Sequence, residues 1–233
     1  MLYSEIAAAM GIPLSSCHGL LKTLVAKGYL YDLGKRSGYY PTQKLLHVAQ
    51  VICERDPLVT TLWPLLLRLR DQTRETVILA KLADQQVVYL SLSESTQSIR
   101  YSHQPGTFKR LHATSSGKAL LAVMSSKDRG KLLDKYTHWD SVTANTHASR
   151  ETLEQDIEEG IQRGWQRSHG ENIEEVGSLA FGFNVYEQAF ALVIAGPLSR
   201  IQHNETSLAA CFPSAKKELV TLLHPTPLTF VGD

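Results

Sequence analysis

Residues 4–30 read Ser4-Glu-Ile-Ala-Ala-Ala-Met-Gly-Ile-Pro-Leu-Ser-Ser-Cys-His-Gly-Leu-Leu-Lys-Thr-Leu-Val-Ala-Lys-Gly-Tyr-Leu30, a stretch that predicts two short helices around a glycine turn. Ser4 is expected to cap the first helix, whose apolar residues repeat at helical spacing until Gly11 interrupts them. The second helix is expected to begin near Pro13 and to end at Gly28, which can take the left-handed conformation of a C-terminal cap. This is the shape of a helix-turn-helix, a common DNA-binding motif.

The two faces of the second helix differ in character. On a helical wheel Cys17, Leu20, Leu21 and Leu24 fall on one face, which we expect to join a core. Small and polar side chains occupy the opposite face, where they are free to enter a DNA groove. The DNA-contact candidates on this helix are Ser15, Ser16, His18, Gly19 and Lys22.

A basic hairpin follows the second helix. Tyrosine-rich segments at 29–31 and 39–40 are typical of strands, and they flank a turn that carries Lys35 and Arg36. These two cations complete the DNA-contact candidates, because they suit phosphate groups. Helix-turn-helix patterns also occur in ordinary helical hairpins, so it is the basic wing that favours DNA.

The composition limits the classes of protein to which the chain can belong. The chain has 233 residues, is 43% hydrophobic and carries a formal net charge of +1, which allows one sizeable core and a small additional domain. No apolar run approaches the roughly 20 residues of a membrane helix, and the first residues do not read as a signal peptide. The three cysteines, Cys17, Cys53 and Cys211, are odd in number and widely spaced, which favours a reducing compartment; we expect the cytoplasm.

Three strings of the chain, taken in order, resemble the IclR family of bacterial transcriptional regulators. They are the stretch from Gly11 to Tyr29, the string Leu111-His-Ala-Thr-Ser-Ser-Gly-Lys-Ala-Leu-Leu-Ala122 and the string Val193-Ile-Ala-Gly-Pro197. The resemblance implies an α+β fold with a winged helix-turn-helix, a linker helix and a GAF-like mixed α/β ligand-binding domain. We place these parts at residues 1–43, 44–56 and 57–233. Family members normally have another helix before Ser4, so the DNA-binding domain is expected to lack its first helix.

Hydrophobic periodicity predicts the elements of the larger domain. A helix is expected to begin at Pro57 after Asp56, which suits its cap. Strands are expected at 76–82, 87–92, 99–102, 165–168, 178–185 and 189–195, and helices at 113–124, 128–136, 150–163 and 204–223.

Motifs for enzyme chemistry fail on inspection. Ser116-Gly117-Lys118 is not a phosphate loop, because His112 stands at the required glycine and Ala119 replaces the magnesium-binding hydroxyl. No Gly-x-Ser-x-Gly elbow is present, and the histidines have no zinc-ligand spacing. We therefore expect no catalytic residues, no metal and no cofactor.

The resemblance also gathers small and hydroxyl side chains into one effector pocket. Its positions in this sequence are Ser115, Ser116, Ser168, Ser178, Val193 and Ala195. Hydroxyls and free amides at a helix start favour an anionic or carbonyl oxygen, and the two apolar residues make one wall hydrophobic. A small organic acid or carbonyl compound fits this description. Each serine could instead simply cap a helix or satisfy a strand.

The sequence therefore predicts a transcriptional regulator, such as a repressor, that binds double-stranded operator DNA and changes its operator affinity when a small-molecule effector binds. A homodimer or a dimer of dimers is expected, because one such module makes too few base contacts for specificity. No membrane partner is expected. The alternative is a small-molecule sensor that has lost DNA binding through its truncated N-terminus. An enzyme on the same sheet is a third interpretation.

Overall fold

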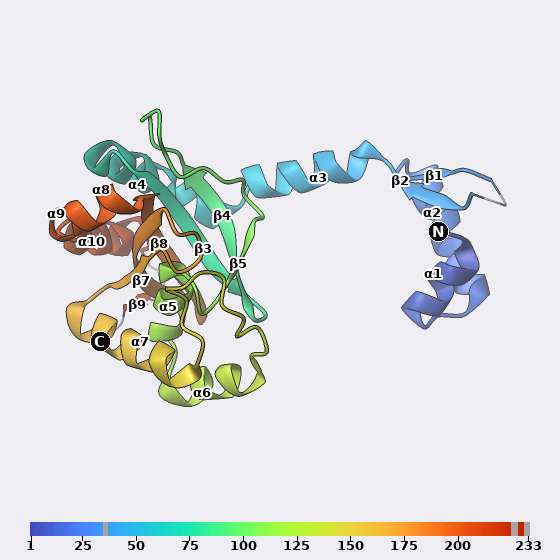
Figure 1. Cartoon of the computed structure of the whole chain (residues 1–233). Coiled ribbons are helices and arrows are strands. Elements are labelled where there is room, and N and C mark those ends of the chain that lie inside the picture. The colour runs from blue at the N-terminus through green and yellow to red at the C-terminus, as the bar shows by residue number, and fades with distance from the viewer. Residues whose placement is uncertain (35–36, 225–227, 231–233) are drawn as a thin grey trace. The chain divides into compact units, whose positions relative to one another are not determined.

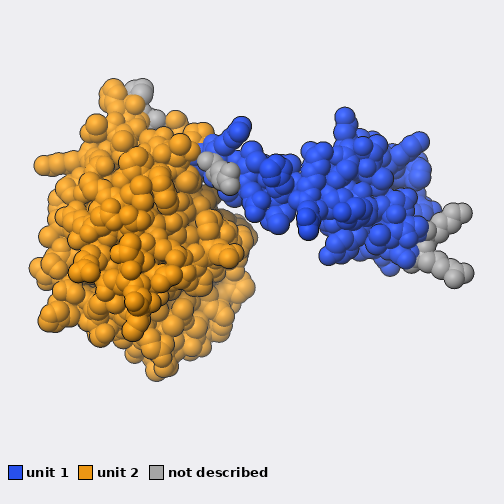
Figure 2. Space-filling view, turned by 90° about the horizontal axis from the view of Figure 1, so that it is seen from above, with its two compact units in different colours: residues 1–56 blue, residues 57–233 orange. Residues whose placement is uncertain are grey.

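The computed structural model describes residues 1–34, 37–224 and 228–230, and its chain divides into two compact units (Figure 2). Unit 1 covers Met1–Asp56 and unit 2 covers Pro57–Asp233. The predicted α+β class is confirmed, since helices flank a mostly antiparallel sheet in unit 2 (Figure 1). Among the residues described, no helix combines the length and apolar character needed to cross a bilayer.

Unit 1 begins with the two predicted helices, α1 (Tyr3–Met10) and α2 (Leu14–Ala26). Gly11 separates them at a φ of 63°, a left-handed conformation that glycine adopts without a steric penalty. The predicted cap at Ser4 is wrong, because α1 begins one residue earlier. The first turn is held instead by Glu5, whose Oε2 accepts from the backbone N–H of Leu2 at 2.7 Å.

The apolar face of α2 is only partly covered. Cys17 and Leu21 are buried and form a small core with Ala7, whereas Leu24 is half-buried. Leu20, which we expected in the core, is exposed, so this prediction is wrong. Its position on the wheel lies at the edge of the apolar face, where the three-residue core is too small to reach it.

A short hairpin and a third helix complete unit 1. Strands β1 (Leu30–Asp32) and β2 (Tyr39–Pro41) pair antiparallel, with Tyr31 opposite Tyr40, and α3 (Gln43–Glu54) follows. Lys44 joins α3 to the end of α2, since its Nζ donates to the carbonyl oxygen of Lys27 at 2.8 Å. The predicted wing-tip cations Lys35 and Arg36 lie outside the described residues.

Unit 2 is built on an antiparallel sheet. Its strand order is β5-β4-β3-β8-β7-β6, and β9 pairs with the free end of β7. The strands are β3 (Thr76–Ala83), β4 (Gln86–Ser93), β5 (Phe108–Arg110), β6 (Gln166–His169), β7 (Val176–Val185), β8 (Gln188–Pro197) and β9 (Leu228–Phe230).

Helices cover both faces of this sheet (Figure 1). One core contains α4 (Pro57–Thr73), α8 (Leu198–His203), α9 (Glu205–Ala209) and α10 (Phe212–Leu223) against Val77 and Leu79. The other contains α5 (Ser115–Ala122), α6 (Ser126–Lys135) and α7 (Arg150–Arg163) against Ile78 and Ala80. Successive residues of β3 thus point into different cores, as the alternation of a strand requires.

Two predicted elements of unit 2 are wrong. Residues 99–102 form no strand, and the strand beside β4 is β5. The apolar residues at 99 and 101 do not share a buried face, because Tyr101 is buried while Ile99 is exposed. The predicted helix at 204–223 is two helices, α9 and α10. Pro213 lies in the first turn of α10, the place where proline's missing N–H costs least.

Helix α5 approaches the backbone of β7 closely at Gly182. A Cβ atom at Gly182 would lie only 2.2 Å from the carbonyl oxygen of Ala119 in α5. A Cβ atom at Gly117 of α5 would lie 1.9 Å from the carbonyl oxygen of Leu111, in the turn before the helix. Both positions therefore require glycine. This close approach fixes the height of α5 above the sheet.

His112 anchors the turn that leads into α5. Its Nε2 lies 3.2 Å from the carbonyl oxygen of Asp140, which can only accept, so the ring donates there. The other ring nitrogen, Nδ1, then accepts from the Tyr136 hydroxyl at 2.7 Å. Burial lowers the pKa of His112, which favours the neutral ring that this arrangement needs.

This histidine makes stability depend on pH. An unfolded histidine has a pKa of about 6.5, and the native pKa of His112 lies below its ordinary value, so acidification protonates the unfolded chain first. The contribution of His112 to the free energy of unfolding is complete above about pH 6.5 and declines as the pH falls below it. Denaturant unfolding between about pH 7 and pH 5 should give a flatter profile for His112→Gln than for the parent. Parallel profiles would contradict the assignment.

Candidate functional site

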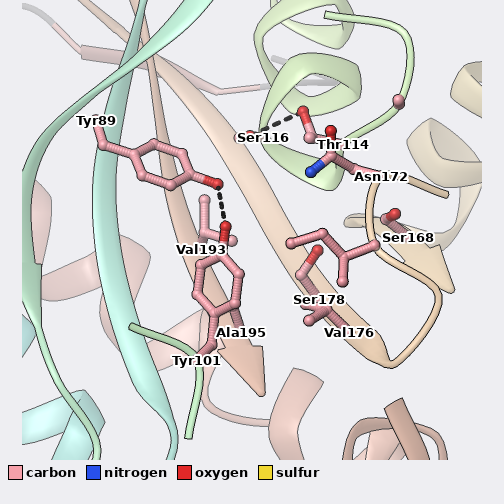
Figure 3. A pocket seen from close by; sticks show the side chains of 12 residues that line it. Tyr89, Tyr101, Thr114, Ser116, Ser168, Asn172, Val176, Ser178, Val193 and Ala195 are labelled. Atoms are coloured by element: carbon pink, nitrogen blue, oxygen red, sulfur yellow. Dashed lines mark hydrogen bonds between the residues drawn. The ribbon is translucent and has the colours of Figure 1, made fainter. Parts of the chain in front are cut away.

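A small cavity of about 20 Å³ lies between the sheet and the start of α5 (Figure 3). The register of the sheet explains its position. Thr76, Ala195, Ser178 and Ser168 lie opposite one another across β3, β8, β7 and β6 and form one row of small side chains. The cavity is lined by Tyr89, Tyr101, Ala113, Thr114, Ser116, Ser168, Asn172, Ile173, Val176, Ser178, Val193 and Ala195.

The structure brings five of the six predicted effector residues to this lining. Ser116, Ser168, Ser178, Val193 and Ala195 all contribute to it. The sixth, Ser115, is fully buried beside them, and its hydroxyl lies 2.7 Å from the hydroxyl of Ser178. That hydrogen bond joins the start of α5 to the middle of the sheet.

The first turn of α5 presents donors to the cavity. Thr114 is the N-cap, and its Oγ1 accepts from the Gly117 N–H at 3.1 Å and from the Ser116 hydroxyl at 3.0 Å. The backbone N–H groups of Ser115 and Ser116 are first-turn donors of the kind that have no partner within the helix. Such donors, at the positive end of the helix dipole, suit a carboxylate or carbonyl oxygen.

Two tyrosines close the side of the cavity opposite the β6–β7 loop (Figure 3). The hydroxyls of Tyr89 and Tyr101 lie 3.4 Å apart, and burial raises the pKa of both phenols, so both are neutral. Neither these tyrosines nor Asn172 were among the predicted site residues. Tyr101 offered a signal in its alternation with Ile99, which was interpreted as a strand. Asn172 belongs to a loop and offered none.

The lining as described contains no charged side chain. Its polar atoms are neutral hydroxyls and one amide, and its apolar wall is formed by Ile173, Val176, Val193 and Ala195. It can therefore bind an oxygenated small molecule by hydrogen bonds, and it holds no general base or nucleophile activated by a neighbouring charge.

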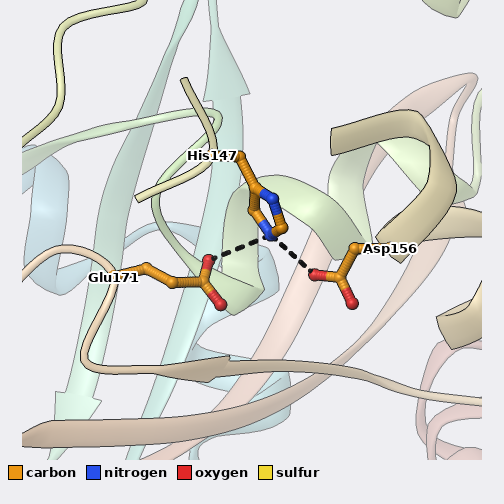
Figure 4. Close-up of side chains that lie close together, drawn as sticks. All are labelled: His147, Asp156 and Glu171. Carbon is orange, nitrogen blue, oxygen red and sulfur yellow. Dashed lines mark hydrogen bonds and ion pairs between the residues drawn. The ribbon is translucent and has the colours of Figure 1, made fainter. Parts of the chain in front are cut away.

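A second cluster joins His147, Asp156 and Glu171, and Glu171 is adjacent in sequence to the lining residue Asn172 (Figure 4). The Nε2 atom of His147 lies 3.1 Å from Asp156 Oδ2 and 3.9 Å from Glu171 Oε2. The sequence analysis missed this group, because its members are distant along the chain and come together only through the fold.

Lys118 supplies the positive charge of this cluster. Its side chain is fully buried, and its Nζ donates to Asp156 Oδ2 at 2.5 Å and to both oxygens of Glu171 at 2.8 and 2.9 Å. The hydrogen bond with His147 and the contacts with Lys118 hold the pKa of Asp156 below its usual value, against the opposing effect of burial. Three of the four carboxylate oxygens thus already bind an ammonium group, so this donor set does not fit a divalent cation.

The predicted DNA-contact residues of α2 share one exposed surface of unit 1. Ser15, Ser16, His18, Gly19 and Lys22 are all exposed, and the ring of His18 lies edge-on to Tyr3. A Cβ atom at Gly19 would meet nothing within 4 Å, so packing within unit 1 does not require glycine there.

Two family profiles match the chain. Residues 3–34 match "IclR helix-turn-helix domain", and residues 50–217 match "Bacterial transcriptional regulator IclR C-terminal". The first covers α1, α2 and β1, and the second covers the end of α3 and most of unit 2.

Curated relatives agree with these profiles. The chain is 29% identical over 229 residues to the transcriptional repressor IclR of Escherichia coli K12, covering 95% of this chain and 82% of that protein. It is 28% identical over 200 residues to the HTH-type transcriptional regulator BhcR of Paracoccus denitrificans, covering 85% and 71% respectively. Both relatives are regulators of transcription.

Solved structures share the fold. An IclR family regulator from Brucella abortus superposes with a TM-score of 0.73 at 22% identity, covering 96% of this chain and 85% of that one. An IclR homologue from Microbacterium hydrocarbonoxydans in complex with 4-hydroxybenzoate gives 0.63 at 20% identity, covering 93% and 92%. The two profiles account for both units in the order in which the structure shows them, and the chain therefore belongs to the IclR family of bacterial transcriptional regulators.

Proposed function

We propose that this protein is a transcriptional regulator whose operator affinity changes when a small oxygenated metabolite binds the cavity beside α5. The observation that carries the proposal is the row of small and hydroxyl side chains across four strands, which faces the donors of a helix start. These side chains leave hydrogen-bonding capacity at this place for a ligand of matching chemistry.

The ligand class follows from the lining. Neutral donors and the first turn of α5 suit the oxygens of a carboxylate, an aldehyde or a ketone, while Val193, Ala195 and Ile173 suit a short apolar body. A small organic acid or carbonyl compound combines both parts. The 4-hydroxybenzoate held by the Microbacterium homologue supports this class, since it joins a carboxylate to an apolar ring.

DNA binding is assigned to unit 1. The exposed face of α2 presents short polar side chains and Lys22, which are suited to a major groove. A two-fold pair of chains would place two such helices on two half-sites, which one module alone cannot read with specificity. We therefore propose a homodimer or a dimer of dimers as the DNA-binding form.

A thermal-shift screen tests the ligand class. Oxo acids, hydroxy acids, aldehydes and 4-hydroxybenzoate, together with amines and neutral sugars as the comparison set, are added to the full chain. A compound that binds only the native state raises the melting temperature. A set of hits confined to amines and neutral sugars would contradict the proposed class. Effector binding without any DNA binding would instead favour a sensor module, the second candidate, which the small core of unit 1 supports.

The DNA assignment predicts a change in salt dependence. Lys22→Ala should lower the slope of log K against log salt by about one unit, because each phosphate contact releases about one counterion. The double variant Lys35→Ala/Arg36→Ala should lower it by about two units at most. The measurement is a binding titration at several salt concentrations with a duplex selected by the full chain from a random library.

Lys127→Ala is the matched control for these variants. Lys127 is an exposed lysine of α6 in unit 2, so its removal should leave the slope unchanged. The DNA-contact face is misassigned if Lys22→Ala behaves like this control. A tighter complex for Gly19→Arg would show that the open surface at Gly19 can gain a DNA contact.

The pocket assignment predicts separate effects on effector and on DNA. Ser178→Ala removes one half-buried hydroxyl that lines the cavity and should weaken effector binding about tenfold to hundredfold. Ala195→Leu should fill the cavity and abolish binding. Both variants should keep ligand-free DNA affinity, because neither lies in unit 1. Calorimetry with a hit from the screen and operator titrations with and without it give the two readouts.

Ser93→Ala provides the control for the lost hydroxyl. Ser93 is buried in β4 and lies outside the cavity lining, and its Oγ has no hydrogen-bond partner among the residues that the structure describes. Its removal should leave effector affinity at the parental value. Parental affinity in both pocket variants would place the effector elsewhere and make the serines structural.

A further inference from the structure

One wall of the cavity is a loop rather than a strand or a helix. Residues 170–175 connect β6 to β7, and Asn172 and Ile173 of this loop line the cavity. The cavity of about 20 Å³ holds roughly one water molecule. Any organic ligand must therefore displace part of the lining before it can bind.

The other walls resist displacement. Helix α5 contacts β7 through backbone at Gly182, and β7 and β8 are central strands paired on both sides. Tyr101 belongs to an irregular segment, but its carbonyl oxygen accepts from Thr76 Oγ1 of β3 at 2.6 Å. The loop carries the exposed residues Glu174 and Glu175, and it is held by hydrogen bonds to neighbouring segments rather than by pairing in the sheet. It can therefore move without breaking the sheet.

The loop is held at Glu171, the residue next to Asn172. The Glu171 side chain is buried and both its oxygens accept from Lys118 Nζ. The backbone is held too, since Thr146 Oγ1 donates to the carbonyl oxygen of Glu171 and Thr143 Oγ1 to that of Gly170, each at 2.6 Å. Of these contacts, only the one between Lys118 and Glu171 joins two charged groups.

Lys118 connects this loop to α5, the helix whose first turn forms the floor of the cavity. Its backbone N–H donates to the carbonyl oxygen of Thr114 at 3.0 Å, so it lies one turn along α5 from the residues that line the cavity. Its second partner, Asp156, is on α7 and forms no part of the loop or of the cavity lining. One ammonium group thus joins the floor of the cavity, its loop wall and a neighbouring helix.

We propose that Lys118 and Glu171 are positioning residues that hold the loop 170–175 closed over the cavity, so that breaking their ion pair is the step that admits a ligand. This inference rests on the proposed function, which makes the cavity the effector site. The pair acts through the loop and touches no ligand. In a buried site of low dielectric its attraction is strong, which makes it a suitable determinant of how often the loop opens.

Two matched variants test this inference. Glu171→Gln and Asp156→Asn each remove one carboxylate from Lys118 and leave it the other, but only Glu171 belongs to the loop. The readout is amide hydrogen exchange in the ligand-free protein at Gly170 and Val176, which stand at the two ends of the loop. The Gly170 N–H donates to the carbonyl oxygen of Val176, and the Val176 N–H donates to that of Ile173. Amides of β8 serve as the reference for global opening.

Glu171→Gln should speed exchange at these two amides by about tenfold to hundredfold relative to β8, the range expected for a lost charge-assisted hydrogen bond. Asp156→Asn should leave that ratio close to the parental value. Unchanged loop exchange in Glu171→Gln, or equal acceleration in both variants, would overturn the proposal. If Glu171→Gln melts below the assay temperature, Glu171→Asp replaces it. This variant keeps the charge but shortens the side chain by one methylene, which weakens the contact with Lys118, so exchange at the two amides should again be faster relative to β8.

A kinetic arm uses 4-hydroxybenzoate as the probe. Glu171→Gln should raise both its association and dissociation rates, whereas Asp156→Asn should leave both unchanged. If the parent does not bind the probe, the proposed ligand class loses support while the exchange measurement still decides the role of the ion pair. If the probe binds and its rates are the same in all three proteins, the loop does not control entry.

Discussion

The central strands β3, β8 and β7 are buried on both faces, and this constraint governs the rest of unit 2. A polar side chain placed there costs about 1–3 kcal/mol unless it finds a hydrogen-bond partner. The hydroxyl of Thr76 donates to the carbonyl oxygen of Tyr101, and that of Ser178 bonds to Ser115. The polar groups of the sheet therefore determine where the flanking segments attach, and the cavity lies between these two attachment points.

Much of this fold could be predicted from local patterns. Alternation and turn residues located β3, β4, β7 and β8, and Gly11 and Pro57 marked helix boundaries correctly. The errors arose where a tertiary contact imitates a local pattern. Residues 99–102 alternate in polarity like a strand, but Tyr101 lines the cavity and the segment pairs with no strand described here. Leu20 lies on the apolar side of its wheel but has no core within reach.

The site was predictable to the extent that its residues belong to recognisable strings. The serines of α5 and the small residues of β8 lie within such strings, whereas Ser168 and Ser178 lie outside them and were predicted from the family resemblance; the register aligns Ser178 with Ala195. Tyr89, Asn172 and the Lys118 cluster could not be found in this way. Lys118 and Glu171 are 53 residues apart, and their contact depends on the path of a loop that carries no motif. Spacing along the chain says little about such contacts, because they are created by packing.

The close seating of α5 on β7 has a consequence for how ligand choice can diversify among proteins of this architecture. With Gly182 of β7 against the backbone of Ala119 of α5, even one added methyl group at residue 182 would push the helix away from the sheet, so the position of α5 cannot be changed by small steps. Evolution can instead change the occupants of the surrounding positions, Val193, Ala195 and the residues of the 170–175 loop, one at a time. The same scaffold can thereby acquire a new chemical preference while its backbone geometry is inherited unchanged.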